Sequence, residues 1–128
     1  MVILDTSIII DHLRLTGKQD SVLDRIVQRV RGDELVISTI TIQELFRGKS
    51  ILQSQSLEML YYMISLFRIL PYSFEVAQKG GEIGRDKKSI IEFADAAIAA
   101  TAIINQARLA TLNPKDFRDI SGLEMFQL

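Results

Sequence analysis

The stretch Met1-Val2-Ile3-Leu4-Asp5-Thr6-Ser7 decides the fold class of this chain. Four consecutive apolar residues are typical of a short strand that is covered on both faces, as strands in parallel sheets are. Asp5, Thr6 and Ser7 are residue types that favour the start of a helix. The stretch therefore predicts a central parallel strand that is followed directly by a helix.

The rest of the chain alternates the same two patterns. Short β-type runs are expected at 35–37, 68–72, 108–112 and 123–127, and helical spacing of apolar residues at 8–13, 22–30, 42–47, 74–83 and 94–106. Because residues 80–89 contain three glycines and many charges, we expect a loop there. Strands that alternate with helices imply right-handed crossovers. We predict an α/β fold, a three-layer α/β/α sandwich with a mostly parallel central sheet, in a single domain over residues 1–128.

The composition restricts the chemistry that this chain can perform. An apolar content of 48% is enough for a packed core and excludes intrinsic disorder. Because the chain has no cysteine and a single histidine, thiolate and multi-histidine metal sites are excluded, so carboxylates would have to hold any metal. The net charge of −1 excludes a general basic field, and any contact with nucleic acid needs a local patch. The short apolar runs and the absence of cysteine lead us to expect a cytoplasmic protein.

Four acidic residues are expected at one edge of the predicted sheet. Asp5 follows the first strand, Glu44 lies in the helix after the second, Asp95 opens an Ala-rich helix, and Asp116 follows the strand that ends at 111–112. In parallel sheets, ligand sites form beyond the carboxyl ends of the strands. Carboxylates without His or Cys form a hard oxygen site that suits Mg²⁺ or Mn²⁺. Such ions orient a phosphodiester and activate water, so the pattern predicts a metal-dependent nuclease.

Each of these acids also has a purely structural interpretation. Asp5 is placed to cap the first helix, and Asp116 to form a turn or a cap. The stretch Thr41-Ile42-Gln43-Glu44 fits a capping box, in which Glu44 would only stabilise the start of a helix. Asp95 would interact favourably with the dipole of its helix, although its place at the head of an apolar stripe means that its charge needs a partner.

The same acids lie in four blocks that resemble the signatures of the PIN-domain ribonucleases. The blocks are 2–7, 38–48, 94–102 and 109–117. Their order, their spacing and the length of the chain are similar to those of the VapC-type toxins of bacterial and archaeal toxin–antitoxin pairs.

The resemblance implies a role for each residue of the site. Asp5, Glu44 and Asp95 would be metal-binding catalytic acids, with Asp116 or the side chain of Asn113 completing the set. Small polar residues would orient the carboxylates or water, namely Thr6, Ser7 and Thr111, and position 7 is Ser where many relatives have Asn. The resemblance also implies Mg²⁺ or Mn²⁺ as cofactor, RNA as substrate, an antitoxin as partner and a homodimer.

Other residues carry weaker signals. Basic side chains could bind RNA phosphates or be ordinary solvated charges, namely Arg47, Arg85, Lys87 and Lys88, together with Arg14, Lys49 and Lys115. We expect His12 to be a surface or half-buried helix residue without a catalytic role. The apolar excess over residues 51–67 fits either ordinary core or a surface that another chain covers.

Three alternatives compete with a toxin ribonuclease. A PIN ribonuclease of RNA processing would contain the same acids. A receiver-like signalling domain also binds Mg²⁺ at a sheet edge, but the paired acids and the strand-end Lys that it needs are missing. A degenerate PIN scaffold would only bind partners, and the acids at 5, 44 and 95 argue against it.

Overall fold

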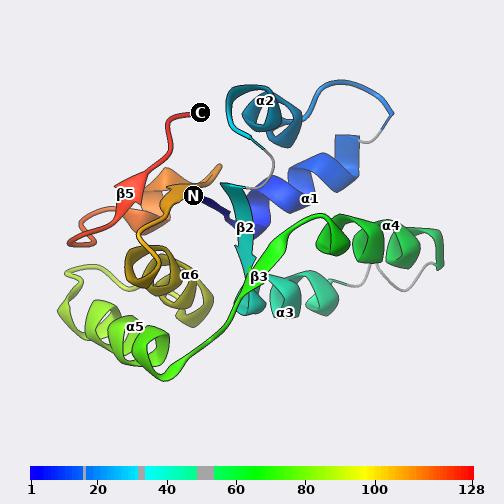
Figure 1. Cartoon of the computed structure of the whole chain (residues 1–128). Helices are drawn as coiled ribbons and strands as arrows, with labels where there is room; N and C mark the ends of the chain where they lie inside the picture. The colour runs from blue at the N-terminus through cyan, green and yellow to red at the C-terminus, as the bar shows by residue number, and fades with distance from the viewer. Residues whose placement is uncertain (16, 32–33, 49–53) are drawn as a thin grey trace.

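A parallel sheet forms the centre of the protein (Figure 1). The computed structural model describes residues 1–15, 17–31, 34–48 and 54–128. The five strands pair in the order β3-β2-β1-β4-β5, and every pair is parallel. They are β1 (Val2–Leu4), β2 (Leu35–Ser38), β3 (Arg68–Leu70), β4 (Arg108–Ala110) and β5 (Glu124–Met125). The predicted α/β class with a parallel sheet is confirmed.

Helices cover both faces of this sheet. They are α1 (Thr6–Leu15), α2 (Val22–Arg29), α3 (Thr39–Arg47), α4 (Ser54–Ser65), α5 (Phe74–Asp86), α6 (Phe93–Ile104) and the short 3₁₀ helix η3 (Pro114–Phe117). Figure 1 shows α5 and α6 side by side, away from α1 and α2.

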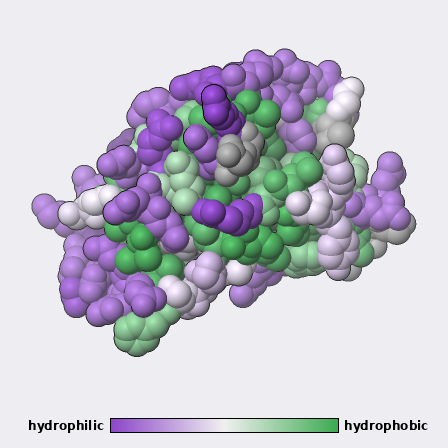
Figure 2. Space-filling model, viewed as in Figure 1, coloured by the Kyte–Doolittle hydropathy of each residue, from purple (hydrophilic) through white to green (hydrophobic). Residues whose placement is uncertain are grey.

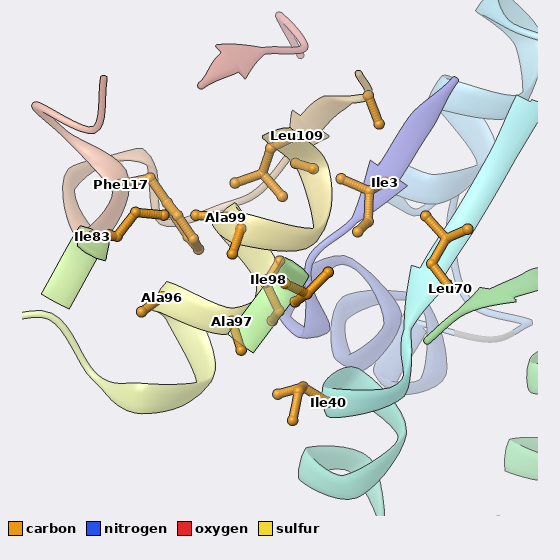
Figure 3. Packing of buried hydrophobic residues seen from close by; sticks show 14 of the residues in the cluster. Ile3, Ile40, Leu70, Ile83, Ala96, Ala97, Ile98, Ala99, Leu109 and Phe117 are labelled. Atoms are coloured by element: carbon orange, nitrogen blue, oxygen red, sulfur yellow. The ribbon is translucent and has the colours of Figure 1, made fainter. Parts of the chain in front are cut away.

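Alternation along the strands divides the core into two apolar clusters. The side chains of Ile3 and Leu109 pack with those of α5, α6 and η3, as Figure 3 shows. Val2 and Leu4 point to the opposite face and pack with residues of α1, α2 and α4. Because successive side chains of a strand alternate between its faces, β1 is buried from both sides. The three-layer architecture is thereby confirmed.

Helix α5 is longer than predicted. The expected loop over residues 80–89 is wrong in its first half, because α5 continues through Gly80, Gly81 and Gly84 to Asp86. Each glycine weakens a helix by about 0.5–1 kcal/mol. Packing against α6 compensates for this cost, since Val76 and Ile83 are both buried on one face of α5.

Three strands are shorter than predicted. β3 ends at Leu70, before Pro71, which has no backbone N–H for the ladder. β4 ends at Ala110, so that Thr111 lies just beyond the strand, at the carboxyl edge of the sheet. β5 spans only Glu124–Met125. Because β4 ends before Thr111, the side chain of Thr111 can turn towards the end of β1, where Asp5 lies.

The apolar excess of residues 51–67 is only partly core. Leu60 and Met63 of α4 are buried, whereas Tyr61 and Tyr62 are exposed. Residues 51–53 lie outside the described part of the chain. Within the described ranges, no helix is long and apolar enough to cross a membrane.

Candidate active site

Asp5 is the most firmly held acid of the predicted site. It follows β1 directly and is only 4% exposed. Its Oδ1 accepts the Thr6 amide at 2.8 Å, while its Oδ2 accepts the hydroxyls of Ser7 at 2.8 Å and of Thr111 at 2.7 Å. The bond to Thr6 supports the start of α1, as a cap would. The Thr111 hydroxyl, however, comes from the neighbouring strand end and fixes the carboxylate at the sheet edge.

Ser7 and Thr111 belong to a small polar network around Asp5. Their hydroxyls lie 3.4 Å apart, and the Ser7 hydroxyl also accepts the Leu112 amide at 3.1 Å. Thr111 accepts the Asn113 amide at 3.0 Å. This network links the end of β4 to the start of α1, because β1 and β4 are adjacent in the sheet.

Glu44 lies in the middle of α3 and does not belong to a capping box. Ser38 is the N-cap of this helix, and its hydroxyl accepts the Ile40 amide at 3.1 Å. The prediction that Thr41 caps the helix is therefore wrong, since α3 already begins at Thr39. Within the described residues the buried Thr41 hydroxyl has no hydrogen-bond partner. Glu44 instead accepts the Thr6 hydroxyl through Oε1 at 2.5 Å, across to α1.

Asp95 lies in the first turn of α6 and is half-buried. Burial is the largest cause that raises its pKa to about 6, and the charges of Asp5, Asp116, Glu44 and Glu92 contribute to the same rise in that order. Among the described residues, no hydrogen bond reaches its carboxylate. A buried charge that is surrounded by like charges is unfavourable unless a cation joins it.

Asp116 and Asn113 lie on the exposed side of the same edge. Asp116 is in the first turn of η3, near enough to Asp95 to raise the pKa of that carboxyl. Asn113 precedes η3, and its side chain makes no cap hydrogen bond. This effect on Asp95 places the Asp116 carboxylate near the other acids of the edge.

The donor set fits a hard divalent cation, although the acids are not drawn into a closed site. Over the described residues, no three acidic, histidine or cysteine side chains form a ready-made metal cluster. Asp5, Glu44 and Asp116 nevertheless all act electrostatically on Asp95, and the side-chain donors of all four acids are oxygens. Repulsion among carboxylates keeps such a cluster open, so a cation would draw the side chains inward.

The family model of the PIN domain matches residues 2–123. The chain belongs to the PIN domain family. This membership confirms the resemblance of the four blocks and rules out a receiver-like domain.

Similar proteins and solved structures match most or all of the chain. Ribonuclease VapC1 of Rickettsia felis is 34% identical, with 97% of this chain and 93% of that protein covered. Ribonuclease VapC10 of Mycobacterium tuberculosis is 28% identical, with 88% and 83% covered. The fold matches VapBC2 of Rickettsia felis, solved with a DNA fragment from its promoter, with a TM-score of 0.82, 26% identity and 100% and 99% coverage. VapBC-1 of nontypeable Haemophilus influenzae matches with a TM-score of 0.80, 27% identity and 99% and 98% coverage.

The basic residues proposed for RNA contact differ in their availability. Arg85 is held by Asp86 through two hydrogen bonds of 2.7 and 2.8 Å, which raise the pKa of Arg85 and lower that of Asp86. Lys87 donates to the Ser89 hydroxyl. Arg47 and Lys88 are exposed. Arg14 and Lys115 are exposed as well, and Lys49 lies outside the described residues. Among the first four candidates, Arg47 and Lys88 are therefore more available than Arg85 and Lys87.

His12 lies away from the acids and is part of the link between α1 and α2. Its Nδ1 is 2.7 Å from the Ser21 hydroxyl and 3.8 Å from Asp24 Oδ1. The hydrogen bonds from Ser21 lower the pKa of Asp24, and the charge of His12 adds to this effect. The expectation of a half-buried helix residue is confirmed.

Sequence reasoning overlooked Glu92 as a neighbour of the site. It is the N-cap of α6, three residues before Asp95, but its side chain makes no capping hydrogen bond. Its charge contributes to the raised pKa of Asp95. The three-residue spacing along the start of a helix was the available signal, because such residues share one face.

Proposed function

We propose that this chain is a metal-dependent endoribonuclease of the VapC type that hydrolyses phosphodiester bonds in RNA. The observation that carries the proposal is the electrostatic convergence of Asp5, Glu44 and Asp116 on Asp95 at the carboxyl edge of the sheet, where none of the described residues supplies a cation to Asp95. The relatives named as VapC ribonucleases support the same activity. We further propose that residues 1–128 act as one PIN domain and that the activity operates in the cytoplasm.

In this proposal, Asp5, Glu44, Asp95 and Asp116 bind Mg²⁺ or Mn²⁺. When bound, such an ion lowers the pKa of a water molecule and neutralises charge on the scissile phosphate. The Ser7 and Thr111 hydroxyls orient Asp5, and Thr6 orients Glu44. These bonds keep lone pairs of both carboxylates aimed at the site before substrate arrives.

The half-buried Asp95 has a second function in this proposal. With a pKa of about 6, its carboxyl carries a proton for part of the time near neutral pH when no cation is bound. Because this proton is lost when the divalent cation binds, the affinity for the cation depends on pH. Arg47 and Lys88 bind phosphates of the RNA away from the cleaved bond.

We propose that an antitoxin protein covers a groove beside Glu44. A cavity of about 310 Å³ between α1, α3 and α4 is lined by Ile10, Leu13, Leu45, Met59 and Leu60, and also by Glu44 and Arg14. An apolar segment of a partner would fill such a groove and hide an acid of the site. The solved VapBC complexes support this partner. A second copy of the chain completes the proposed assembly, as a homodimer.

The test is cleavage of a structured RNA by the purified chain. The chain is first stripped of metal with EDTA and then given Mg²⁺, Mn²⁺ or Zn²⁺. We expect cleavage to stop in EDTA and to return with Mg²⁺ or Mn²⁺, whereas Zn²⁺ does not support it. The matched control is Asp95→Asn, purified in the same way, which reports any contaminating nuclease. Undiminished cleavage in EDTA by a preparation whose Asp95→Asn control is silent would refute the metal mechanism.

A further inference from the structure

Three exposed arginines lie near the amino ends of the strands, away from the acids of the candidate active site. Arg25 and Arg29 lie on successive turns of α2, and Arg108 begins β4. Figure 1 shows the last residues of the chain running from β5 towards α2, and Figure 2 shows hydrophilic residues along the same upper edge of the molecule. We call these three residues the arginine cluster. The acids and this cluster thus lie at opposite ends of the strands.

Two members of the arginine cluster are held against one aromatic ring. The guanidinium carbons of Arg29 and Arg108 lie 4.7 and 5.0 Å from the ring centroid of Phe126, which is buried. The face of such a ring attracts cations. Arg29 is also fixed by a hydrogen bond of 2.7 Å that its Nη1 donates to the carbonyl oxygen of Gln127. Both guanidiniums are therefore positioned before any ligand arrives.

This arrangement brings like charges together without a matching anion. Because both guanidiniums lie beside one ring, their charges are less than about 10 Å apart, which is within the Debye length at about 0.1 M salt. Arg25 and Arg29 are four residues apart on one helix, a spacing at which like charges are destabilising. None of the three forms an ion pair with a carboxylate of the described residues, and this includes Glu124, the register partner of Arg108 in β5. Binding of an anion would relieve the repulsion.

The chemistry of the arginine cluster favours phosphate groups as that anion. A guanidinium presents a planar fork of N–H donors that matches two oxygens of one phosphate. A nucleic-acid strand carries one negative charge at each nucleotide, so consecutive phosphates can contact several members of the cluster.

The short strands favour RNA that is bound at the acidic edge. β1 has three residues, so its two ends are only about 10 Å apart. A folded RNA whose scissile bond lies beside the acids is therefore large enough to reach the arginine cluster as well.

We propose that Arg25, Arg29 and Arg108 bind the phosphate backbone of the RNA substrate outside the cleavage site. This inference rests on the proposed function, because it takes RNA as the ligand, and it adds a second binding surface to the acidic edge. The acids act on the bond that is cleaved, whereas the arginine cluster raises the affinity for RNA. Because its contacts are to phosphates, the cluster discriminates little between base sequences.

The experiment is fluorescence anisotropy of a labelled RNA hairpin with the full chain in EDTA, at several concentrations of NaCl. We expect the double variant Arg29→Gln and Arg108→Gln to weaken binding by about tenfold and to lower the slope of the salt dependence by about two. Arg25→Gln should weaken binding by about threefold and lower the slope by about one. The Arg25 side chain makes no hydrogen bond or ion pair within the described residues, so this variant should keep the melting temperature of the wild type.

The matched control is Lys79→Gln on α5, which also removes one positive charge and should bind RNA as the wild type does. Unchanged affinity and salt dependence in the double variant and in Arg25→Gln would overturn the inference. A loss of the same size in Lys79→Gln would also overturn it, because binding would then respond to net charge alone. If the variants lose affinity only for a duplex DNA of the same length, the cluster is a DNA surface instead.

The cleavage test with EDTA is independent of this binding test. A chain that binds RNA through the arginine cluster but does not cleave it would refute the nuclease and keep the binding surface. A chain that cleaves RNA and binds it equally well without the three arginines would refute the binding surface and keep the nuclease.

Discussion

Asp5 and Asp95 lie at the same edge of the sheet, yet the surrounding residues stabilise the charge of the Asp5 carboxylate and destabilise that of Asp95. Asp5 accepts three hydrogen bonds, from the Thr6 amide and from the Ser7 and Thr111 hydroxyls. Asp95 has a pKa raised to about 6 by burial and by neighbouring acids. The comparison shows that one half of the site is organised in advance, whereas the other half depends on a cation.

The largest effect that we predict is on RNA cleavage, because cleavage needs both the preorganised carboxylate of Asp5 and the cation-dependent carboxylate of Asp95. Asp5→Asn, Asp95→Asn and Glu44→Gln should each lower the rate of RNA cleavage by more than about 100-fold, because a neutral amide is a poor ligand for Mg²⁺. Single-turnover cleavage of a labelled RNA measures this loss. Asp20→Asn, on an exposed loop residue, is the control and should cleave normally. Wild-type rates in any acid variant would make that acid purely structural.

A smaller effect should follow when only the orientation of an acid is disturbed. Thr6→Val removes the hydroxyl that donates a hydrogen bond to Glu44, and Thr111→Val removes the one that donates to Asp5. Both substitutions keep the shape of the side chain. Cleavage should fall by about 10- to 100-fold, the usual range for residues that orient metal ligands. A higher Mg²⁺ requirement should accompany the loss. An unchanged Mg²⁺ dependence in both variants would show that these bonds do not position the acids.

The sequence predicted the sheet and its acidic edge because both depend on local patterns. The apolar run before Asp5 and the helix signals after it predicted β1 and α1, and the structure has both at those places. Parallel strands then bring their carboxyl ends to one edge, and the helix that leads into β4 begins at that same edge, which is why Asp5 and Asp95 could be expected together. The choice between Asp116 and Asn113 could not be made, because it depends on how the chain turns after β4.

The errors at residues 80–86 and at Thr41 have different physical origins, one in tertiary packing and one in a competing local cap. Residues 80–86 contain glycines that favour a loop, but contact with α6 keeps them helical. The spacing of Thr41 and Glu44 matches a capping box, but Ser38 starts the helix earlier. In both cases the local signal was real, and a tertiary contact or a competing cap outweighed it.

In the metal-free protein, we predict that Asp95→Asn and Asp5→Asn change the free energy of unfolding in opposite directions. Asp95→Asn should stabilise the fold by about 1–2 kcal/mol at pH 7.5, because each raised pKa unit corresponds to about 1.4 kcal/mol before solvent screening. Asp5→Asn should destabilise it by about 1–3 kcal/mol, because the new amide group cannot accept all the bonds that Asp5 accepts. Urea unfolding in EDTA measures both changes. Equal signs for the two variants would contradict the comparison.

The pH dependence of the wild type follows from the pKa of Asp95. Since this pKa is about 6 in the folded chain and 3.8 for an ordinary aspartate, the folded state holds the proton more tightly. The contribution of Asp95 to stability is therefore greatest below about pH 4 and is lost as the pH rises through about 6. The stabilisation by Asp95→Asn should vanish near pH 4. A constant difference between variant and wild type from pH 4 to 7.5 would exclude this linkage.

The smallest effects should lie in the helix that carries Glu44. Ser38→Ala removes the actual cap of α3 and should cost about 1 kcal/mol of unfolding free energy. Thr41→Val keeps the shape of a buried side chain whose hydroxyl has no hydrogen-bond partner in the described structure, so it should change stability by less than about 0.5 kcal/mol or raise it. A greater loss in Thr41→Val than in Ser38→Ala would restore Thr41 as the cap.

The most direct test of the central claim is calorimetric titration of Mn²⁺ into the metal-free chain. If the acids form a cation site, the wild type binds Mn²⁺ at pH 7.5, and Asp95→Asn binds it much more weakly. At pH 6 the wild type should also release a proton on binding, which buffers of different ionisation enthalpy would reveal, while the variant releases less. Equal binding and equal proton release by the two proteins would contradict the claim that Asp95 completes a divalent-cation site with Asp5, Glu44 and Asp116.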